Sequence, residues 1–453
     1  MPMRHKGENM KLDKDFIWGV SASAYQIEGA EREDGRGASV WDSEFSSGHV
    51  LGDMNGKIAC DHYHRYKEDV ALLKKLGIKN YRFSVSWPRI IPNGTGEINE
   101  KGVEFYQNLV DELIAADITP WATIYHWELP RKLYEQGGYL NGKFSDWFAD
   151  FAAKVVEIFG DKVTNYIIFN EPQCVVEEAH YSGNHAPFLR LTRKELFRVA
   201  HNVLLAMGKA EKSMRKAAKH KLNLGIAPCF TPMMPLNEKD EISALKYNFA
   251  PSGDFYDGCF FTDALIKGEF TDEYKEWFKK YDYNPSEEDM KIIKSDLDFF
   301  GANLYRGFYV EKAAHGMKRI PIVPNEMLTA MDWQITPEAV KYLAKYYYER
   351  YKLPIILTEN GIGLNEWKTL NGDIPDDLRI DYMKRHIANM KEIAEKYHVK
   401  GYFYWSFMDN FEWSLGYSKR FGLVYVDYNT LERIPKKSAY WYKKVIESNG
   451  EEL

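Results

Sequence analysis

Residues 166–171 read YIIFNE, a short apolar run that ends in an asparagine and a glutamate. Runs that are apolar on both faces are typical of strands in a parallel sheet covered by helices. We expect each run of this kind to form a buried strand. Together with this one, eight occur along the chain: FIWGVSASA (16–24), NYRFSVSW (80–87), ITPWATIYHW (118–127), YIIFNE (166–171), LNLGIAPC (222–229), LDFFGANLY (297–305), IILTENG (355–361) and GYFYWSFMD (401–409).

Charged amphipathic segments separate these runs, and their apolar positions fall at helical spacing. Examples are YKEDVALLKKLG (66–77), FYQNLVDELIAAD (105–117), WFADFAAKVVEIFG (147–160) and IDYMKRHIANMKEIAEKY (380–397). Eight strands that alternate with helices predict an α/β fold, a single (β/α)8 TIM barrel. No interdomain linker or low-complexity tract interrupts the pattern. We therefore expect one domain over residues 11–453, preceded by a flexible N-terminal extension over residues 1–10.

Composition argues against several classes of partner. The 453 residues are 45% hydrophobic and 28% charged, which suits a globular protein. A net charge of −6 without a Lys/Arg block argues against nucleic acid. No run reaches the roughly 20 apolar residues that a membrane span needs, and no apolar leader follows the first methionine, so no membrane association and a cytoplasmic location are expected. The four widely separated cysteines predict no disulfide framework.

Two glutamates lie at the ends of predicted strands. Glu171 closes the fourth run, and Glu359 lies near the end of the seventh. In barrels of this kind the active site is built at the C-terminal ends of the strands, so the two side chains are expected to meet over one mouth. Charged residues also cap strands for solubility. Position alone therefore leaves a structural role open.

The residues around both glutamates form motifs. NEP (170–172) and TENG (358–361) resemble the acid/base and nucleophile signatures of glycoside hydrolase family 1. The resemblance implies a retaining β-glycosidase, in the first place a β-glucosidase acting on terminal β-D-glucosyl residues, with galactosyl and fucosyl residues as further candidates. It covers nearly the whole chain, through FIWGVSASAYQIEGA (16–30), YRFSVSWPRI (81–90), YHWELP (125–130), FFGANLY (299–305) and NFEWSLGYSKRFGLVYVDY (410–428).

The resemblance also implies catalytic roles. Glu359 would be the nucleophile and Glu171 the acid/base, a pair that retaining hydrolysis places roughly 5–5.5 Å apart. The charge of Glu359 is expected to raise the pKa of Glu171, which then starts protonated. Arg82 and Tyr305 match positions that hydrogen-bond the nucleophile, and Asn170 matches the residue that holds the sugar 2-hydroxyl. No metal and no cofactor are expected.

A further set of residues matches substrate-binding positions. Amide, imidazole and carboxyl groups hydrogen-bond sugar hydroxyls, and indole faces cover the C–H surface of the ring. Trp333 matches an aglycone-side position, where a core role is nearly as compatible with its surroundings. The glycone set consists of Gln26, His126, Trp127, Asn170, Asn303, Trp405, Glu412, Trp413 and Phe421.

Glu412 separates the functional alternatives. Relatives that cleave phosphoglycosides carry a small neutral pair where this chain has Glu412 and Trp413, and a carboxylate there would repel a sugar 6-phosphate. The sequence therefore favours free β-glycosides or oligosaccharides, although Lys419 and Arg420 lie nearby. A 6-phospho-β-glycosidase and a non-catalytic carbohydrate-binding barrel are the alternatives. The non-catalytic barrel is disfavoured because both glutamates are present. The sequence does not indicate an oligomeric state.

Two positions depart from the family pattern. Ile168 stands where the family usually has threonine, two residues before the asparagine of NEP. Glu128 stands where HWD is usual. The first change is expected to alter hydrogen bonding beneath Glu171, and the second lengthens a carboxylate beside His126 and Trp127.

Overall fold

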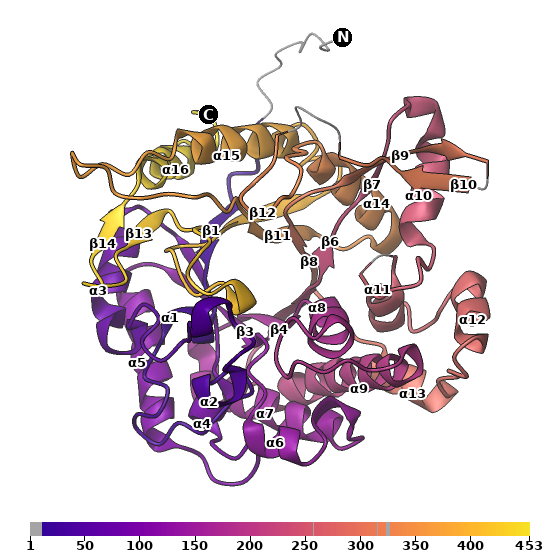
Figure 1. Ribbon diagram of the computed structural model, residues 1–453, viewed down its shortest axis with the longest axis horizontal. Coiled ribbons are helices and arrows are strands. Elements are labelled where there is room, and N and C mark those ends of the chain that lie inside the picture. The colour runs from indigo at the N-terminus through magenta and orange to yellow at the C-terminus, as the bar shows by residue number, and fades with distance from the viewer. Residues whose placement is uncertain (1–10, 257, 315, 323–326) are drawn as a thin grey trace.

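The computed structural model describes residues 11–453 apart from 257, 315 and 323–326, so the predicted extension over residues 1–10 lies outside the described residues. Within them, eight parallel strands form a closed barrel in which β12 pairs again with β1 (Figure 1). The predicted TIM barrel and its eight strands are confirmed. The strands are β1 (Ile17–Ser21), β2 (Asn80–Ser84), β3 (Thr119–Tyr125), β4 (Asn165–Asn170), β5 (Asn223–Ala227), β8 (Phe299–Leu304), β11 (Ile355–Asn360) and β12 (Val399–Trp405).

Helices surround the barrel (Figure 1). The four segments predicted from helical spacing form α3 (His62–Lys75), α5 (Glu100–Ala115), α7 (Phe144–Phe159) and α15 (Asp377–Lys391). The others are α1 (Ala24–Ile27), α2 (Ser43–Ser46), α4 (Trp87–Ile90), α6 (Arg131–Glu135), α8 (Pro172–Val176), α9 (Arg193–Ala217), α10 (Glu241–Phe249), α11 (Phe260–Ile266), α12 (Asp272–Lys279), α13 (Glu287–Ile293), α14 (Ala339–Tyr351) and α16 (Lys437–Glu447). Short strands outside this order are β6 (Cys229–Phe230), β7 (Met233–Pro235), β9 (Phe308–Ala313), β10 (Gly316–Arg319), β13 (Val424–Val426) and β14 (Arg433–Pro435).

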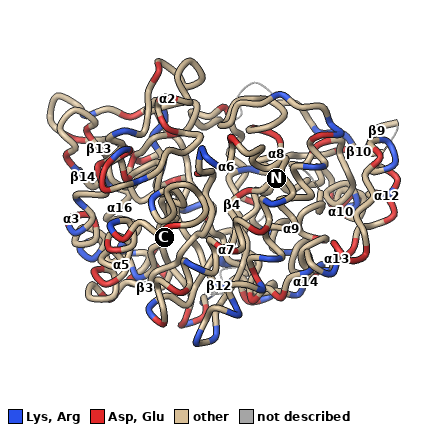
Figure 2. Tube along the Cα trace, turned by 90° about the horizontal axis from the view of Figure 1, so that it is seen from below, with Lys and Arg blue, Asp and Glu red and all other residues tan. Residues whose placement is uncertain are grey.

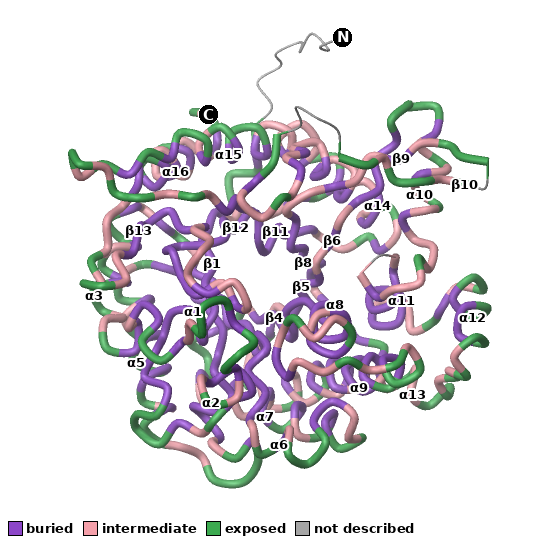
Figure 3. The backbone as a smooth tube through the Cα atoms, viewed as in Figure 1, coloured by how far each residue is buried: buried purple, intermediate pink, exposed green. Residues whose placement is uncertain are grey.

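Helix α7 illustrates how the outer layer is held. Its Phe148, Phe151 and Val155 recur at helical spacing and are buried, while Asp150 and Glu157 are exposed. The ring of Phe151 stacks on Trp87, with 4.8 Å between centroids. Burial of apolar surface on this scale is the main stabilising contribution to the layer. Figure 3 shows the same division throughout, with buried residues toward the barrel and exposed residues on the outer rim.

The barrel interior is filled by a separate small cluster. Its members come from alternate strand positions: Trp121, Ile167, Ala227, Phe299, Ile356 and Phe403. This layer closes the barrel beneath the strand ends, as is usual for the fold. Ile168 belongs instead to the main hydrophobic cluster and is fully buried. This departure from the family pattern therefore adds apolar packing, and its side chain supplies no hydrogen bond near Glu171.

Charged residues of both signs are interspersed over the outside of the molecule (Figure 2). Among the described residues, no helix combines the length and the apolar character that a membrane crossing requires.

Candidate active site

The strand ends bring Glu171 and Glu359 to one cavity of about 420 Å³. Glu171 follows β4 directly and caps α8, with Pro172 as the first helical residue. Glu359 is the penultimate residue of β11. The chain after it passes so close to β12 that a Cβ on Gly361 would lie only 1.8 Å from the backbone oxygen of Trp405. Glycine at this position therefore allows the loop to pack behind Glu359.

Glu359 is surrounded by donors. Arg82 Nη1 donates to its Oε1 at 2.6 Å, and the Tyr305 hydroxyl donates to its Oε2 at 2.7 Å. Burial raises the pKa of Glu359, while Arg82 and Tyr305 act in the opposite direction. Charge-assisted hydrogen bonds of this kind favour the ionised carboxylate and fix its orientation.

Glu171 has weaker partners. Its Oε1 accepts from the Asn303 amide at 2.8 Å, and its Oε2 accepts from the Cys174 thiol at 3.1 Å. Burial, and second the charge of Glu359, raise the pKa of Glu171 to about 7. The direction matches the expectation from sequence, but burial contributes more than the neighbouring charge.

A hydrogen-bond network joins the surroundings of the two carboxyl groups. Asn170 Oδ1 accepts from Arg82 Nη2 at 2.7 Å and from Asn303 Nδ2 at 3.0 Å. Thr358 donates in turn to Asn303 Oδ1 at 2.7 Å. Residues from β2, β4, β8 and β11 are thereby held in register. A side chain fixed by several partners gives up little freedom when substrate binds.

Aromatic rings form one wall of the cavity. The His126 ring lies nearly parallel to Trp405 and to Trp413, at centroid distances of 5.8 and 5.9 Å. Burial lowers the pKa of His126 well below its usual range, so its imidazole is neutral at physiological pH. Its Nδ1 has no hydrogen-bond partner among the described residues. Trp127 lines the same wall.

Glu412 also lines the cavity. Its Oε2 is buried and lacks a hydrogen-bond partner within the described part of the chain. Burial, followed by the charges of Glu359 and Glu171, raises its pKa to about 8. A buried polar atom without a partner is costly, so this oxygen is available for a ligand hydroxyl.

Gln26 and Glu128, which were singled out in the sequence, are among the residues that lie outside the cavity lining. The amide of Gln26 donates to Asn410 and to the Phe411 carbonyl and accepts from Ser23. Glu128 accepts from Ser86 at 2.7 Å and pairs with Arg36, whose Nη2 lies 3.3 Å away. Burial raises the pKa of Glu128 to about 7. The Glu128 carboxyl therefore supports the wall behind His126 and Trp127 without facing the cavity.

The outer part of the cavity contains Trp333, Phe421 and the side chain of Arg306, which the sequence did not single out. The Trp333 ring is half-buried and lies 5.3 Å from the Tyr305 ring between centroids. Arg306 stands over Trp333 at 5.4 Å and has no ion pair with any described residue. Cys174 and Cys229, which line the cavity beside Glu171, were not predicted from the sequence either. The position of Arg306 directly after Tyr305 was the available signal.

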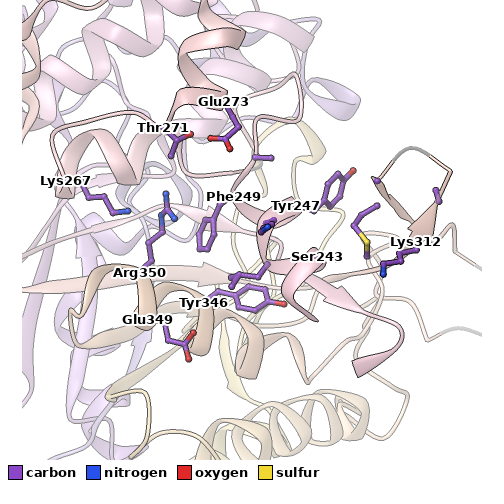
Figure 4. Close-up of a pocket in the computed structure, with 16 residues that line it drawn as sticks. Ser243, Tyr247, Phe249, Lys267, Thr271, Glu273, Lys312, Tyr346, Glu349 and Arg350 are labelled. Carbon is purple, nitrogen blue, oxygen red and sulfur yellow. The ribbon is translucent and has the colours of Figure 1, made fainter. Parts of the chain in front are cut away.

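A second, larger hollow of about 1050 Å³ opens on the surface among α10, α12, α14 and the β9–β10 hairpin (Figure 4). Two of the basic residues that line it, Lys267 and Arg350, pair with the buried Asp263. Among the described residues that line it, no pair of carboxyl groups has the contrasting surroundings of Glu171 and Glu359. We therefore place the chemistry at the barrel mouth.

The barrel carries two unlike carboxyl groups at its strand ends, an aromatic wall and unpaired polar atoms. This is the arrangement of a glycoside hydrolase. The chain belongs to glycosyl hydrolase family 1, whose family model matches residues 8–451. It is accordingly an O-glycoside hydrolase.

Similar proteins span the same length. The chain is 41% identical over 445 residues to beta-glucosidase A of Thermotoga maritima, and the matched region covers 97% of this chain and 98% of that relative. It is 39% identical over 447 residues to beta-glucosidase A of Acetivibrio thermocellus, covering 96% and 98% of the two chains. The solved family 1 β-glucosidase from Thermotoga maritima superimposes with a TM-score of 0.89 at 39% identity, covering 98% of this chain and 99% of that one.

Proposed function

We propose that this enzyme is a retaining β-glucosidase that removes terminal, unphosphorylated β-D-glucosyl residues. The observation that carries the proposal is the contrast between its two carboxyl groups. Glu359 is held by an arginine and a tyrosine, which favours the ionised form, whereas the pKa of Glu171 is raised to about 7. One group is thus suited to attack and the other to proton transfer.

The mechanism follows from this contrast. Glu359 attacks the anomeric carbon while Glu171 protonates the departing glycosidic oxygen. The resulting glucosyl ester neutralises Glu359, which lowers the pKa of Glu171, and Glu171 then takes a proton from the water that cleaves the ester. Asn170, held by Arg82 and Asn303, would bind the sugar 2-hydroxyl. Trp405 would lie under the ring, and Trp333 on the aglycone side.

The charges around Glu412 support a preference for free sugars. Arg420 donates to Asp409 and lies over the Tyr425 ring, and neither Lys419 nor Arg420 lines the cavity. A 6-phosphate near Glu412 would therefore meet no cation from this segment. Because the pKa of Glu412 is about 8, its carboxyl group is largely neutral near pH 7 and can both donate to and accept from a hydroxyl. The preference for free sugars over 6-phosphates therefore depends more on the lack of a cation from this segment than on repulsion between Glu412 and the phosphate.

The proposal is tested by comparing nitrophenyl β-glucoside with its 6-phosphate. We expect hydrolysis of the free glucoside with retention at the anomeric carbon, and little turnover of the phosphate. Turnover of the phosphate alone would refute the substrate assignment. A carbohydrate-binding barrel without activity would hydrolyse neither compound. Galactoside, fucoside and xyloside analogues and cello-oligosaccharides would rank the remaining substrates.

The pKa of Glu171 predicts the alkaline limb of the pH profile. Glu171 must be protonated in the free enzyme, so kcat/KM should fall roughly tenfold per pH unit above about pH 7. On the acid side the rate should fall where Glu359 becomes protonated, and because its pKa is also raised the optimum should be narrow. Initial rates on nitrophenyl β-glucoside across this range check the prediction. A rate that stays constant well above pH 7 would contradict it.

Glu412→Gln tests the glycone contact. The substitution keeps the shape of the side chain but changes its donors and acceptors, so kcat/KM on the β-glucoside should fall about 10- to 100-fold. A β-xyloside, which lacks the 6-hydroxymethyl group, serves as the matched substrate and should lose less. Equal losses on both substrates would show that Glu412 does not contact that group.

Cellobiose degradation in the cytoplasm fits these features. The 1,4-beta-D-glucan glucohydrolase of Thermotoga neapolitana is 40% identical to this chain. The four cysteines are present as free thiols, as a reducing compartment would keep them. Cellobiose therefore belongs in the substrate panel.

A further inference from the structure

Two cysteines far apart in sequence meet beside Glu171. Cys174 lies one helical turn after Glu171 in α8, and its thiol donates to the Glu171 carboxyl at 3.1 Å. Cys229 begins β6, where it pairs in register with Asn303 of β8, the residue that donates to the other oxygen of Glu171. Gln173 ties the two segments together by donating to the Cys229 carbonyl at 3.0 Å.

The side-chain ligand atoms of Glu171, Cys174 and Cys229 all lie within 4.8 Å of one another. All three residues line the cavity, so a dissolved ion can reach them. Two sulfur atoms and one carboxylate oxygen are a ligand set that binds zinc and softer ions strongly, and the cavity leaves room for water as a further ligand.

The electrostatic surroundings also favour a cation. Glu171, Glu359 and Glu412 share the cavity, and each of the first two raises the pKa of Glu412. The charge of Glu359, which raises the pKa of the neighbouring Glu171, would also attract a divalent ion bound there.

We propose that Glu171, Cys174 and Cys229 form a binding site for a thiophilic divalent cation such as Zn²⁺ or Cd²⁺, and that occupation of this site inhibits the enzyme reversibly. On binding, the ion exchanges water ligands for two sulfurs and one carboxylate oxygen, and the protons of the two thiols and of the Glu171 carboxyl group pass to solvent. Glu171 then no longer carries the proton that the leaving group needs. The inhibition rests on the proposed role of Glu171, whereas the binding does not.

Cadmium alone is the probe, because thiolate–cadmium bonds give an ultraviolet charge-transfer absorption that is independent of activity. Titration of the chelator-treated full-length protein should saturate at one Cd²⁺ per chain. Hydrolysis of nitrophenyl β-glucoside should fall in parallel, and a chelator should restore it. Saturation without this absorption, or inhibition that precedes it, would overturn the proposal. If the protein did not hydrolyse β-glucosides, the absorption would still report on the site.

The double variant Cys174→Ser/Cys229→Ser removes both sulfur ligands and should lose the absorption, with inhibition relative to its own activity weakened by more than about 10-fold. The matched control is Cys60→Ser/Cys259→Ser, which removes two thiols that do not line this cavity. It should keep both signals. Equal behaviour of the two double variants would refute the site. If the first failed to fold, Cys229→Ser alone, at a half-buried position, removes one of the two sulfur ligands and should reduce the absorption and weaken the inhibition by cadmium.

The carboxylate ligand is tested separately. Glu171→Gln keeps both thiols, so cadmium should still give the charge-transfer absorption, but the affinity should fall about 10-fold or more because an amide oxygen replaces an anionic ligand. An affinity equal to that of the wild type would show that Glu171 is not a ligand. The proposal would then be wrong as stated.

Discussion

Glu359→Ala is expected to lower hydrolysis of nitrophenyl β-glucoside at least about 10⁴-fold, because it removes the group proposed to form the covalent intermediate. Glu359 accepts from Arg82 and Tyr305, and alanine leaves space between these donors and the anomeric carbon. Azide or formate can enter that space and attack in its place. Activity should therefore recover in part as either anion is added.

The product distinguishes this rescue from a general salt effect. Azide would attack once, from the side where Glu359 stood, so a β-glucoside should yield an α-glucosyl azide. Glu412→Ala is the matched control, since it empties a carboxyl site in the same cavity without removing the proposed nucleophile. It should show no azide rescue. Substantial activity of Glu359→Ala without added anion, or a β-azide product, would refute the assignment of the nucleophile.

The barrel and the two glutamates could be predicted because both depend on local sequence. YIIFNE and IILTENG are apolar over nearly their full length, which specifies buried strands, and each carries its glutamate at or near the strand end. The hydrogen bonds from Arg82 and Tyr305 to Glu359 were expected from flanking motifs, and the structure has both.

Features that depend on the path of the backbone could not be predicted. Trp127, Glu171 and Trp413 have φ angles of 77°, 43° and 49°, in the left-handed region that such residues seldom adopt. Tertiary packing imposes these angles, for example through the bond from the Trp127 indole to the Asn170 carbonyl at 3.0 Å. The local conformational preferences of these residue types therefore do not predict the positive φ angles.

Contacts between residues that are distant in the sequence could not be predicted either. Cys174 and Cys229 show no motif spacing, so their meeting beside Glu171 depends on β6 extending next to β8. The hydrogen bonds that join the Gln26 amide to Ser23, Asn410 and Phe411 were likewise not predicted. Each of these arrangements is set by contacts between segments that are distant in the chain.

Glu171→Ala is expected to affect substrates according to their leaving group. A dinitrophenyl β-glucoside needs little protonation of its oxygen, so formation of the glucosyl-enzyme should be only slightly slower. Cellobiose needs full protonation and should lose about 10²- to 10⁴-fold in kcat/KM. The alkaline limb near pH 7 should disappear, because the group whose pKa is about 7 is gone.

Azide gives a second, independent signature of this variant. Without Glu171 the glucosyl-enzyme lacks a base to activate water, so it should accumulate, and azide, which needs no base, should release it as the β-glucosyl azide. Glu178→Ala is the matched control: its carboxyl lines the same cavity but is bound by Tyr256, Ser182 and Asn184. Azide should not accelerate that variant. Equal losses of Glu171→Ala on dinitrophenyl glucoside and cellobiose would show that Glu171 does not transfer the proton, since only a proton donor discriminates between leaving groups in this way.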